Sequence, residues 1–207
     1  SFNEFNPMFT RDRFSFQASG IAGSNDTFGE ELVHSGLWDN FSYSLGQFHY
    51  ETNGFRKNND LRQDIYNVFA QGMINPNLSI QAEYRHRHLE HGDLLFNGDL
   101  KAFDDSFRRE VTTDSVRTGL RYSPTANSDL ILSAMYLDTL RDRQQQLVLS
   151  PFIPPADYSD TIGQRGFIGE AQYVYRRDPF DLILGAGRRD ISADFSANSS
   201  TDFGSFG

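Results

Sequence analysis

Residues 78–88, Leu-Ser-Ile-Gln-Ala-Glu-Tyr-Arg-His-Arg-His, show the most regular alternation of apolar and polar side chains in the chain. Successive side chains of a β-strand point to opposite faces, so this segment predicts a strand with two unlike faces. One face would carry Leu78, Ile80, Ala82, Tyr84 and His86. The other would carry Ser79, Gln81, Glu83, Arg85 and Arg87.

The same alternation recurs along the chain and predicts about nine strands. They fall within residues 14–19, 28–38, 41–52, 64–74, 78–88, 115–122, 130–136, 167–175 and 180–186. Each is expected to be near the ~9–11 residues that a tilted barrel strand needs to cross a bilayer. In 41–52 the apolar positions switch parity after Gly46, which predicts a β-bulge near Gly46-Gln47.

Short polar turns alternate with long polar connections between these segments. The short turns are Trp38-Asp39-Asn40, Asn75-Pro76-Asn77, Pro124-Thr125-Ala126-Asn127 and Arg177-Asp178-Pro179. The long connections run roughly over 51–63, 89–111 and 139–163. This rhythm is typical of an up-and-down barrel whose two ends differ, as in a bacterial outer membrane. The short turns would then be periplasmic and the long loops extracellular.

Composition excludes several classes of protein. The chain of 207 residues has no cysteine, so disulfides, cysteine-bound zinc and thiol catalysis are excluded. A net charge of -9 argues against nucleic acid as a partner. No apolar run approaches the ~20 residues of a membrane-spanning helix. A mean hydropathy of -0.55 remains compatible with a barrel, in which only alternate strand residues face lipid.

Two features favour a membrane barrel over a soluble β-sandwich, which would show the same alternation. The long connections are rich in charges and amides, as in Arg56–Asp60 and Arg141–Gln146. Aromatic residues also gather beside the short turns, where an interfacial girdle would lie. These interfacial aromatics are Trp38, Phe41, Tyr43, Tyr122, Tyr173, Tyr175 and Phe180.

The predicted fold is an all-β, antiparallel, up-and-down transmembrane β-barrel, present here as a partial barrel of about nine strands. Single-chain bacterial barrels have an even number of strands, so nine strands predict part of a larger barrel of ~14–20 strands. Residues 1–207 would form one outer-membrane barrel segment. Within it, 1–10 would be a periplasmic lead-in, 11–189 the strands, and 190–207 the start of an extracellular loop.

Several stretches resemble a known family. They are Phe5-Asn6-Pro7-Met8-Phe9, Gly46-Gln47-Phe48-His49-Tyr50-Glu51-Thr52-Asn53-Gly54-Phe55-Arg56, Asn58-Asn59-Asp60 and Asp64-Ile65-Tyr66-Asn67. They are similar to the barrel part of large Gram-negative outer-membrane proteins that often carry tetratricopeptide repeats ahead of the barrel. Some of these are described as TonB-dependent-receptor-like. The resemblance covers roughly residues 5–95 and implies a barrel fold in the bacterial outer membrane.

The predicted functional residues lie on the polar strand faces. Glu83, Arg85, Arg87, Arg117 and Arg121 are expected to face a lumen, as a basic stripe beside a carboxylate. His86 and His88 share a strand face and are weak candidates for metal ligands. The favoured interpretation is that their imidazoles lie at the rim of the barrel and contact water or lipopolysaccharide phosphates. No nucleophile–base pattern appears, so neither an enzyme nor a cofactor is expected.

The favoured function is a channel or transport pore with a polar lumen and long extracellular loops. One alternative is a plugged structural or complex-forming outer-membrane barrel that binds a partner through its loops. A second is a soluble carbohydrate-binding β protein. The expected partners are outer-membrane lipid and lipopolysaccharide, together with periplasmic or other envelope proteins, and no nucleic acid.

Overall fold

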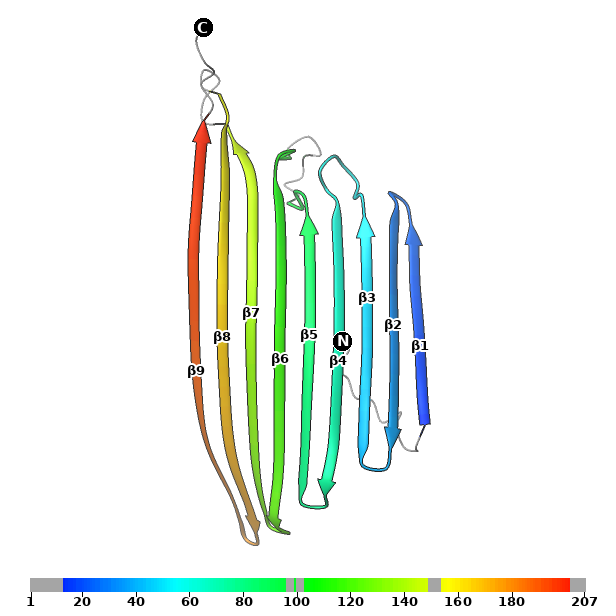
Figure 1. The fold of residues 1–207 in the computed structure, drawn as a ribbon, viewed down its shortest axis with the longest axis vertical. Coiled ribbons are helices and arrows are strands. Elements are labelled where there is room, and N and C mark those ends of the chain that lie inside the picture. Colours follow the sequence, from blue (N-terminus) through cyan, green and yellow to red (C-terminus); the bar gives the residue numbers. More distant parts are fainter. Residues whose placement is uncertain (1–12, 96–98, 100–102, 149–153, 202–207) are drawn as a thin grey trace.

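A computed structural model of the chain describes residues 13–95, 99, 103–148 and 154–201. They form one antiparallel sheet in which the strands lie side by side in chain order (Figure 1). The strands are β1 (Arg13–Gly23), β2 (Thr27–Trp38), β3 (Phe41–Thr52), β4 (Leu61–Asn75), β5 (Leu78–His91), β6 (Arg108–Thr125), β7 (Ser128–Leu147), β8 (Ala156–Arg177) and β9 (Phe180–Thr201). The prediction of an all-β, up-and-down antiparallel topology is therefore confirmed.

The described residues include no helix that is long and apolar enough to cross a membrane. The predicted lead-in, residues 1–10, lies outside the described residues, and so does the end of the predicted terminal loop, residues 202–207.

The two ends of the sheet carry different connections. All four predicted short turns lie at one end, the lower end in Figure 1, and join strands through residues 39–40, 76–77, 126–127 and 178–179. The opposite end, called the loop end here, carries the turn 24–26, the loop 53–60 and the described residues between β5 and β6 and between β7 and β8. Asn25 and Asp26 have φ values of 59° and 52°. Asn and Asp tolerate this left-handed conformation better than most residues, which suits a tight turn.

The strands reach further toward the loop end than the sequence predicted. The β7–β8 ladder is unbroken from Ser128↔Tyr175 to Leu147↔Ala156, so much of the predicted loop 139–163 is strand. Likewise β9 continues to Thr201, which corrects the assignment of residues 190–201 to a loop. The β7 extension is rich in Arg, Asp and Gln and lacks apolar alternation, whereas in the β9 extension Ile191, Ala193, Phe195 and Ala197 alternate with polar residues. The hydrogen bonds between paired strands are made by the backbone, so strand pairing does not require apolar alternation of the side chains.

The bulge predicted near Gly46-Gln47 is absent. The β2–β3 and β3–β4 registers run through these residues without a shift. The apolar residues Phe48 and Tyr50 therefore lie on the face opposite to Leu45, rather than on the same face. Register shifts occur instead between Met73 and Asn75 and between Tyr122 and Thr125, beside two of the short turns.

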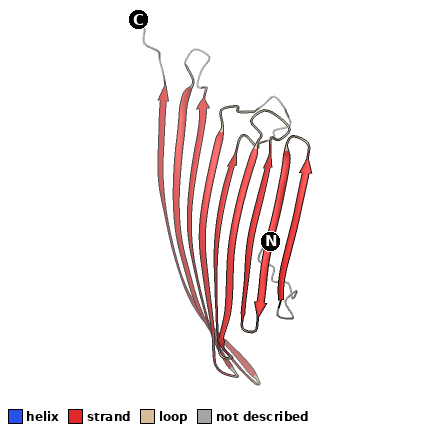
Figure 2. Ribbon diagram, turned by 45° about the vertical axis from the view of Figure 1, so that its right-hand side comes forward, coloured by secondary structure: helices blue, strands red, loops and turns tan. Residues whose placement is uncertain are grey.

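The sheet is twisted and curved but open, with β1 and β9 at its two edges (Figure 2). Neighbouring strands alternate in direction, so the first and ninth strands run the same way. The two edges therefore cannot pair with each other in an antiparallel ladder. A closed barrel is not formed by the nine described strands.

The sheet is a single layer with almost no core. Phe69, Ala156 and Val174 are the only buried apolar residues in the described part of the chain, and none of its side chains is fully buried. The accessible surface is 14119 Å², whereas a compact monomer of this mass would expose only ~9,800 Å². A large share of the apolar surface is thus uncovered.

Two of the connections at the loop end are tied to each other. Asn59 Nδ2 donates to the carbonyl oxygen of Asp93 over 2.8 Å, and Asn58 Nδ2 donates to the carbonyls of Asp104 and Phe107 over 2.7 and 2.9 Å. Lys57 also donates to the Asp105 carboxylate at 2.9 Å and holds the pKa of Asp105 below its usual range. That stabilisation is present at neutral pH and is lost as the pH falls through the lowered pKa.

Gly54 is required by this loop structure. Its φ is +71°, and a Cβ atom there would lie 2.2 Å from the carbonyl oxygen of Asn59. We expect Gly54→Ala to open the loop at a cost of about 1–2 kcal/mol, because an L side chain disfavours this conformation. Tryptic cleavage at the exposed Lys57 should then be roughly tenfold faster.

Gly163→Ala is the matched control, because nothing lies within 4 Å of a Cβ at that strand position. Equal cleavage rates for the two variants would contradict the role assigned to Gly54.

Candidate functional site

The strand register sorts the side chains onto two faces, which we call the polar face and the apolar face. On the polar face, Glu83 of β5 lies directly opposite Arg117 of β6. Because side chains alternate, Arg85 and Arg87 on β5 and Arg121 on β6 point to the same side. The five residues predicted to line a lumen thus share one face of the sheet.

The register adds three arginines to this set. Arg109 on β6 and Arg141 and Arg143 on β7 have the same orientation. We call the seven residues the arginine ladder: Arg85, Arg87, Arg109, Arg117, Arg121, Arg141 and Arg143. Arg109, Arg141 and Arg143 were not predicted from the sequence, because they lie in polar strand extensions that were predicted to be loops. The sequence Arg141-Asp142-Arg143 is charged at every position, so it carries no apolar alternation that would have identified a strand.

In the middle of the ladder, one carboxylate compensates two guanidinium groups. Glu83 has a side chain that is 10% exposed, and its oxygens lie 3.6 Å from Arg85 and 3.8 Å from Arg117. Asn67 Nδ2, on the neighbouring β4, donates to Glu83 Oε1 over 2.7 Å. This cluster lies beside a groove of about 550 Å³, whose lining includes Phe69, Gln81, Glu83, Arg117, Met135 and Glu170.

A second carboxylate anchors the ladder near the short turns. Asp129 accepts hydrogen bonds from Arg121 at 3.0 Å, from Arg176 at 2.7 Å and from the Ser123 hydroxyl at 2.5 Å. Asp129 itself is buried, while both arginines keep more than half of their side chains exposed. The cluster joins β6, β7 and β8 at this end.

The ladder is less well compensated near the loop end. Arg143 hydrogen-bonds Asp160, and its guanidinium lies over the Tyr158 ring at 5.2 Å from the centroid. Arg109 stacks over Phe107 at 5.4 Å. No ion pair among the described residues involves Arg87, Arg109 or Arg141. Positive charge therefore exceeds negative charge at this end of the polar face.

The opposite face carries an apolar band in the half of the sheet nearer the short turns. Tyr84, Val116, Tyr136 and Phe167 lie in one row across β5–β8, toward the loop end of the band. Small and aliphatic side chains fill the rows below: Ala70, Ile80, Ala82, Leu120, Leu132, Ala134 and Ala171. Most of the large side chains in the band are exposed.

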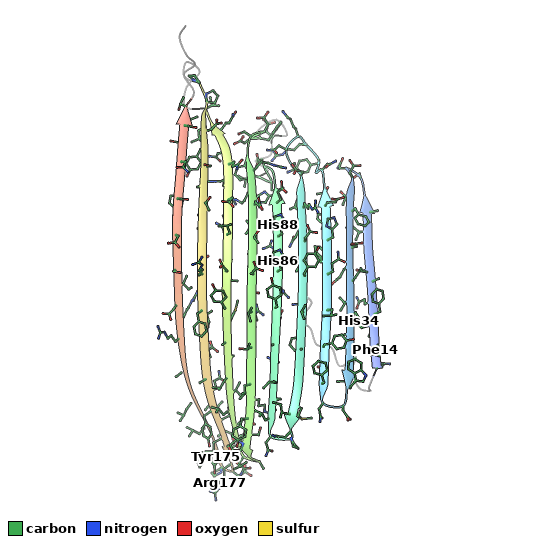
Figure 3. All side chains as sticks on the ribbon, in the orientation of Figure 1. Phe14, His34, His86, His88, Tyr175 and Arg177 are labelled. Carbon is green, nitrogen blue, oxygen red and sulfur yellow. The ribbon has the colours of Figure 1, made fainter. Side chains whose placement is uncertain are left out.

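The aromatics predicted beside the short turns border this band on its other side. All seven, Trp38, Phe41, Tyr43, Tyr122, Tyr173, Tyr175 and Phe180, lie on the apolar face. Trp38 stacks on Tyr43 at 5.5 Å and Tyr175 contacts Phe180 at 6.5 Å, measured between ring centroids. Figure 3 shows Tyr175 at the lower end of β8 and Phe14 low on β1. The band is thus flanked by two aromatic rows.

Above the band, the same face becomes charged. His86 and His88 lie on the upper half of β5 (Figure 3), beyond Tyr84. His86 Nδ1 lies 2.9 Å from Asp114, and His88 Nδ1 lies 3.2 Å from the Thr112 hydroxyl and 3.7 Å from Glu110. Each imidazole has its own partner across the β5–β6 ladder. Within the part of the chain that the structure describes, no group of three or more His, Asp or Glu residues is arranged to hold a metal ion.

Neither the known protein-family models nor the curated protein sequences include one that matches this chain. The function must therefore be argued from the two faces themselves.

Proposed function

We propose that this sheet is part of the wall of an outer-membrane β-barrel that forms a channel. The apolar band would face lipid, and the polar face with its arginine ladder would line an aqueous lumen. The observation that carries the proposal is a single-layer sheet with one exposed apolar face flanked by aromatic rows. Soluble monomers rarely expose contiguous apolar patches above a few hundred Å².

The height of the band fits a membrane. On β8 it runs from Phe167 to Tyr175, about 27 Å along the strand at ~3.4 Å per residue. A strand tilt of about 40° reduces this to roughly 20 Å, near the ~25 Å apolar band of outer-membrane barrels. The charged residues above it, such as His86 and Asp114, would lie at the level of lipid headgroups or lipopolysaccharide.

Closure of the barrel would require further strands. Because the two open edges run in the same direction, antiparallel closure takes an odd number of additional strands, which makes the total even. The resemblance of roughly residues 5–95 to the barrel part of large outer-membrane proteins supports the same arrangement. We propose that these strands belong to the same protein; a native protein with an intact mass near 23.6 kDa would contradict this part of the proposal.

The fluorescence of Trp38, the only tryptophan in the sequence, can show which face of the sheet contacts lipid. In vesicles, we expect phospholipids brominated near the headgroup to quench its fluorescence by at least half, and those brominated near the bilayer centre to quench it less. A control protein with Trp38→Phe and Gln81→Trp carries its indole on the polar face. That indole should resist brominated lipid and respond to aqueous iodide. Equal lipid quenching at both sites would contradict the assignment of the faces.

Conductance in planar bilayers tests the channel itself. An open lumen lined by the polar face should give discrete conductance steps after insertion. A protein that inserts with Trp38 at the interface but gives no conductance would favour a plugged, structural barrel.

A further inference from the structure

We propose that Arg109, Arg141 and Arg143 form a binding site for a multiply charged oxyanion, with phosphate-type oxygens, on the polar face near the loop end. The placement of this site within a lumen rests on the proposed function. The binding chemistry rests on the local geometry of three neighbouring arginines on β6 and β7.

The register brings like charges together at this site. Arg109 lies directly opposite Arg143, so their Cβ atoms are about 4.5–5.5 Å apart, and like charges in this position are destabilising. Arg141 lies two residues before Arg143 on the same strand face. Three guanidinium groups thus gather within reach of one small ligand.

The surrounding residues do not neutralise this charge. Asp160, opposite Arg143 on β8, is the one carboxylate among the described residues that forms an ion pair with this group. The neighbours directly opposite Arg141 are Val111 and Ile162, which are apolar. Next to Arg109 on its other side is His91, whose Nδ1 lies 2.6 Å from the carbonyl oxygen of Gly92. An anion would relieve the remaining repulsion.

Some of the arginine side chains on this face have a buried hydrogen-bond donor without an acceptor in the described structure. The Nε atoms of Arg109 and of Arg87, lower on the ladder, are buried and have no hydrogen-bond partner. Buried donors without partners are costly, and a bound oxyanion would satisfy them. Guanidinium groups bind phosphate and carboxylate oxygens through paired N–H donors, which lysine does not offer in a fixed geometry.

The charge of the polar face on β5–β7 is also opposite in sign to the net charge of the whole chain. The net charge is -9, yet on β5–β7 the polar face carries the seven ladder arginines against two carboxylates, Glu83 and Asp129. Both carboxylates already form ion pairs with ladder arginines. Field lines from such a stripe would be concentrated within a lumen and would raise the local concentration of anions.

Titration calorimetry of the intact protein in nanodiscs with inorganic pyrophosphate tests the site. We expect saturable binding that weakens as salt rises, and a loss of affinity of about tenfold or more for Arg109→Gln and for Arg141→Gln, since each removes charge-assisted hydrogen bonds. Arg141 is exposed, so its variant should keep the fold. Arg165→Gln is the matched control: this exposed arginine lies on the opposite face, 3.5 Å from Asp138, and should leave the affinity unchanged.

Absence of binding, or equal affinity in all variants, would overturn the proposed site. The titration does not depend on an open channel, so one experiment can contradict the anion site while the other supports the channel, or the reverse. Conductance without pyrophosphate binding would refute the site and leave the channel. Binding that depends on Arg141 in a protein without conductance would support the site and refute the channel.

Discussion

Replacing Ala134 by arginine is expected to destabilise the protein in a bilayer by about 2–4 kcal/mol, the cost of an arginine near the midplane on the lipid-facing side of a barrel. Ala134 lies in the middle of the apolar band, between Thr118 on β6 and Gly169 on β8. Neither neighbour has a carboxylate that would compensate the new charge. The free energy of unfolding in urea, measured in lipid vesicles, gives the effect.

Ser133→Arg is the matched control, because Ser133 is the preceding residue and points to the opposite face. It lines the groove beside Glu83 and Glu170, where an added arginine meets carboxylates and solvent. Its effect should stay within about 0.5 kcal/mol, as for an ordinary surface substitution. If the two variants were destabilised equally, the proposed separation into a lipid face and a lumen face would be wrong.

The faces of the sheet were predictable where alternation is strong. From Leu78 to Tyr84 every second side chain is apolar, and the structure places Ile80 and Ala82 on the face opposite to that of Glu83 and Arg85. The turns were equally informative, since Asp39-Asn40 and Pro76-Asn77 suit tight connections. Both signals are local, so single residues and their neighbours sufficed to predict them.

The extension of β7 could not be predicted in this way. Arg141 and Arg143 belong to a segment without apolar alternation, and their strand conformation depends on backbone pairing with residues 156–163 of β8. The ties between loops, such as Asn59 to Asp93, join residues far apart in the chain. No local pattern reports such contacts. The uncompensated end of the arginine ladder became visible only through the register.

Glu83→Ala is expected to destabilise the protein by about 2–3 kcal/mol, because Glu83 makes charge-assisted contacts to three neighbours. Its carboxylate accepts from Asn67 at 2.7 Å and lies within 4 Å of Arg85 and Arg117. Asn67 is only 3% exposed, so the substitution removes the acceptor of a buried amide. Two like-charged guanidinium groups would also lose the carboxylate between them. Urea unfolding at neutral pH measures the loss.

Two variants separate the charge from the hydrogen bond. Glu83→Gln keeps an acceptor for Asn67 and loses only the charge, so its cost should be about half that of Glu83→Ala. Glu170→Gln makes the same chemical change on the same face, at an exposed carboxylate without an ion pair in the described structure, and should cost less than about 0.5 kcal/mol. Equal stability of all three variants would mean that water in a wide lumen solvates Arg85 and Arg117 as well as Glu83 does.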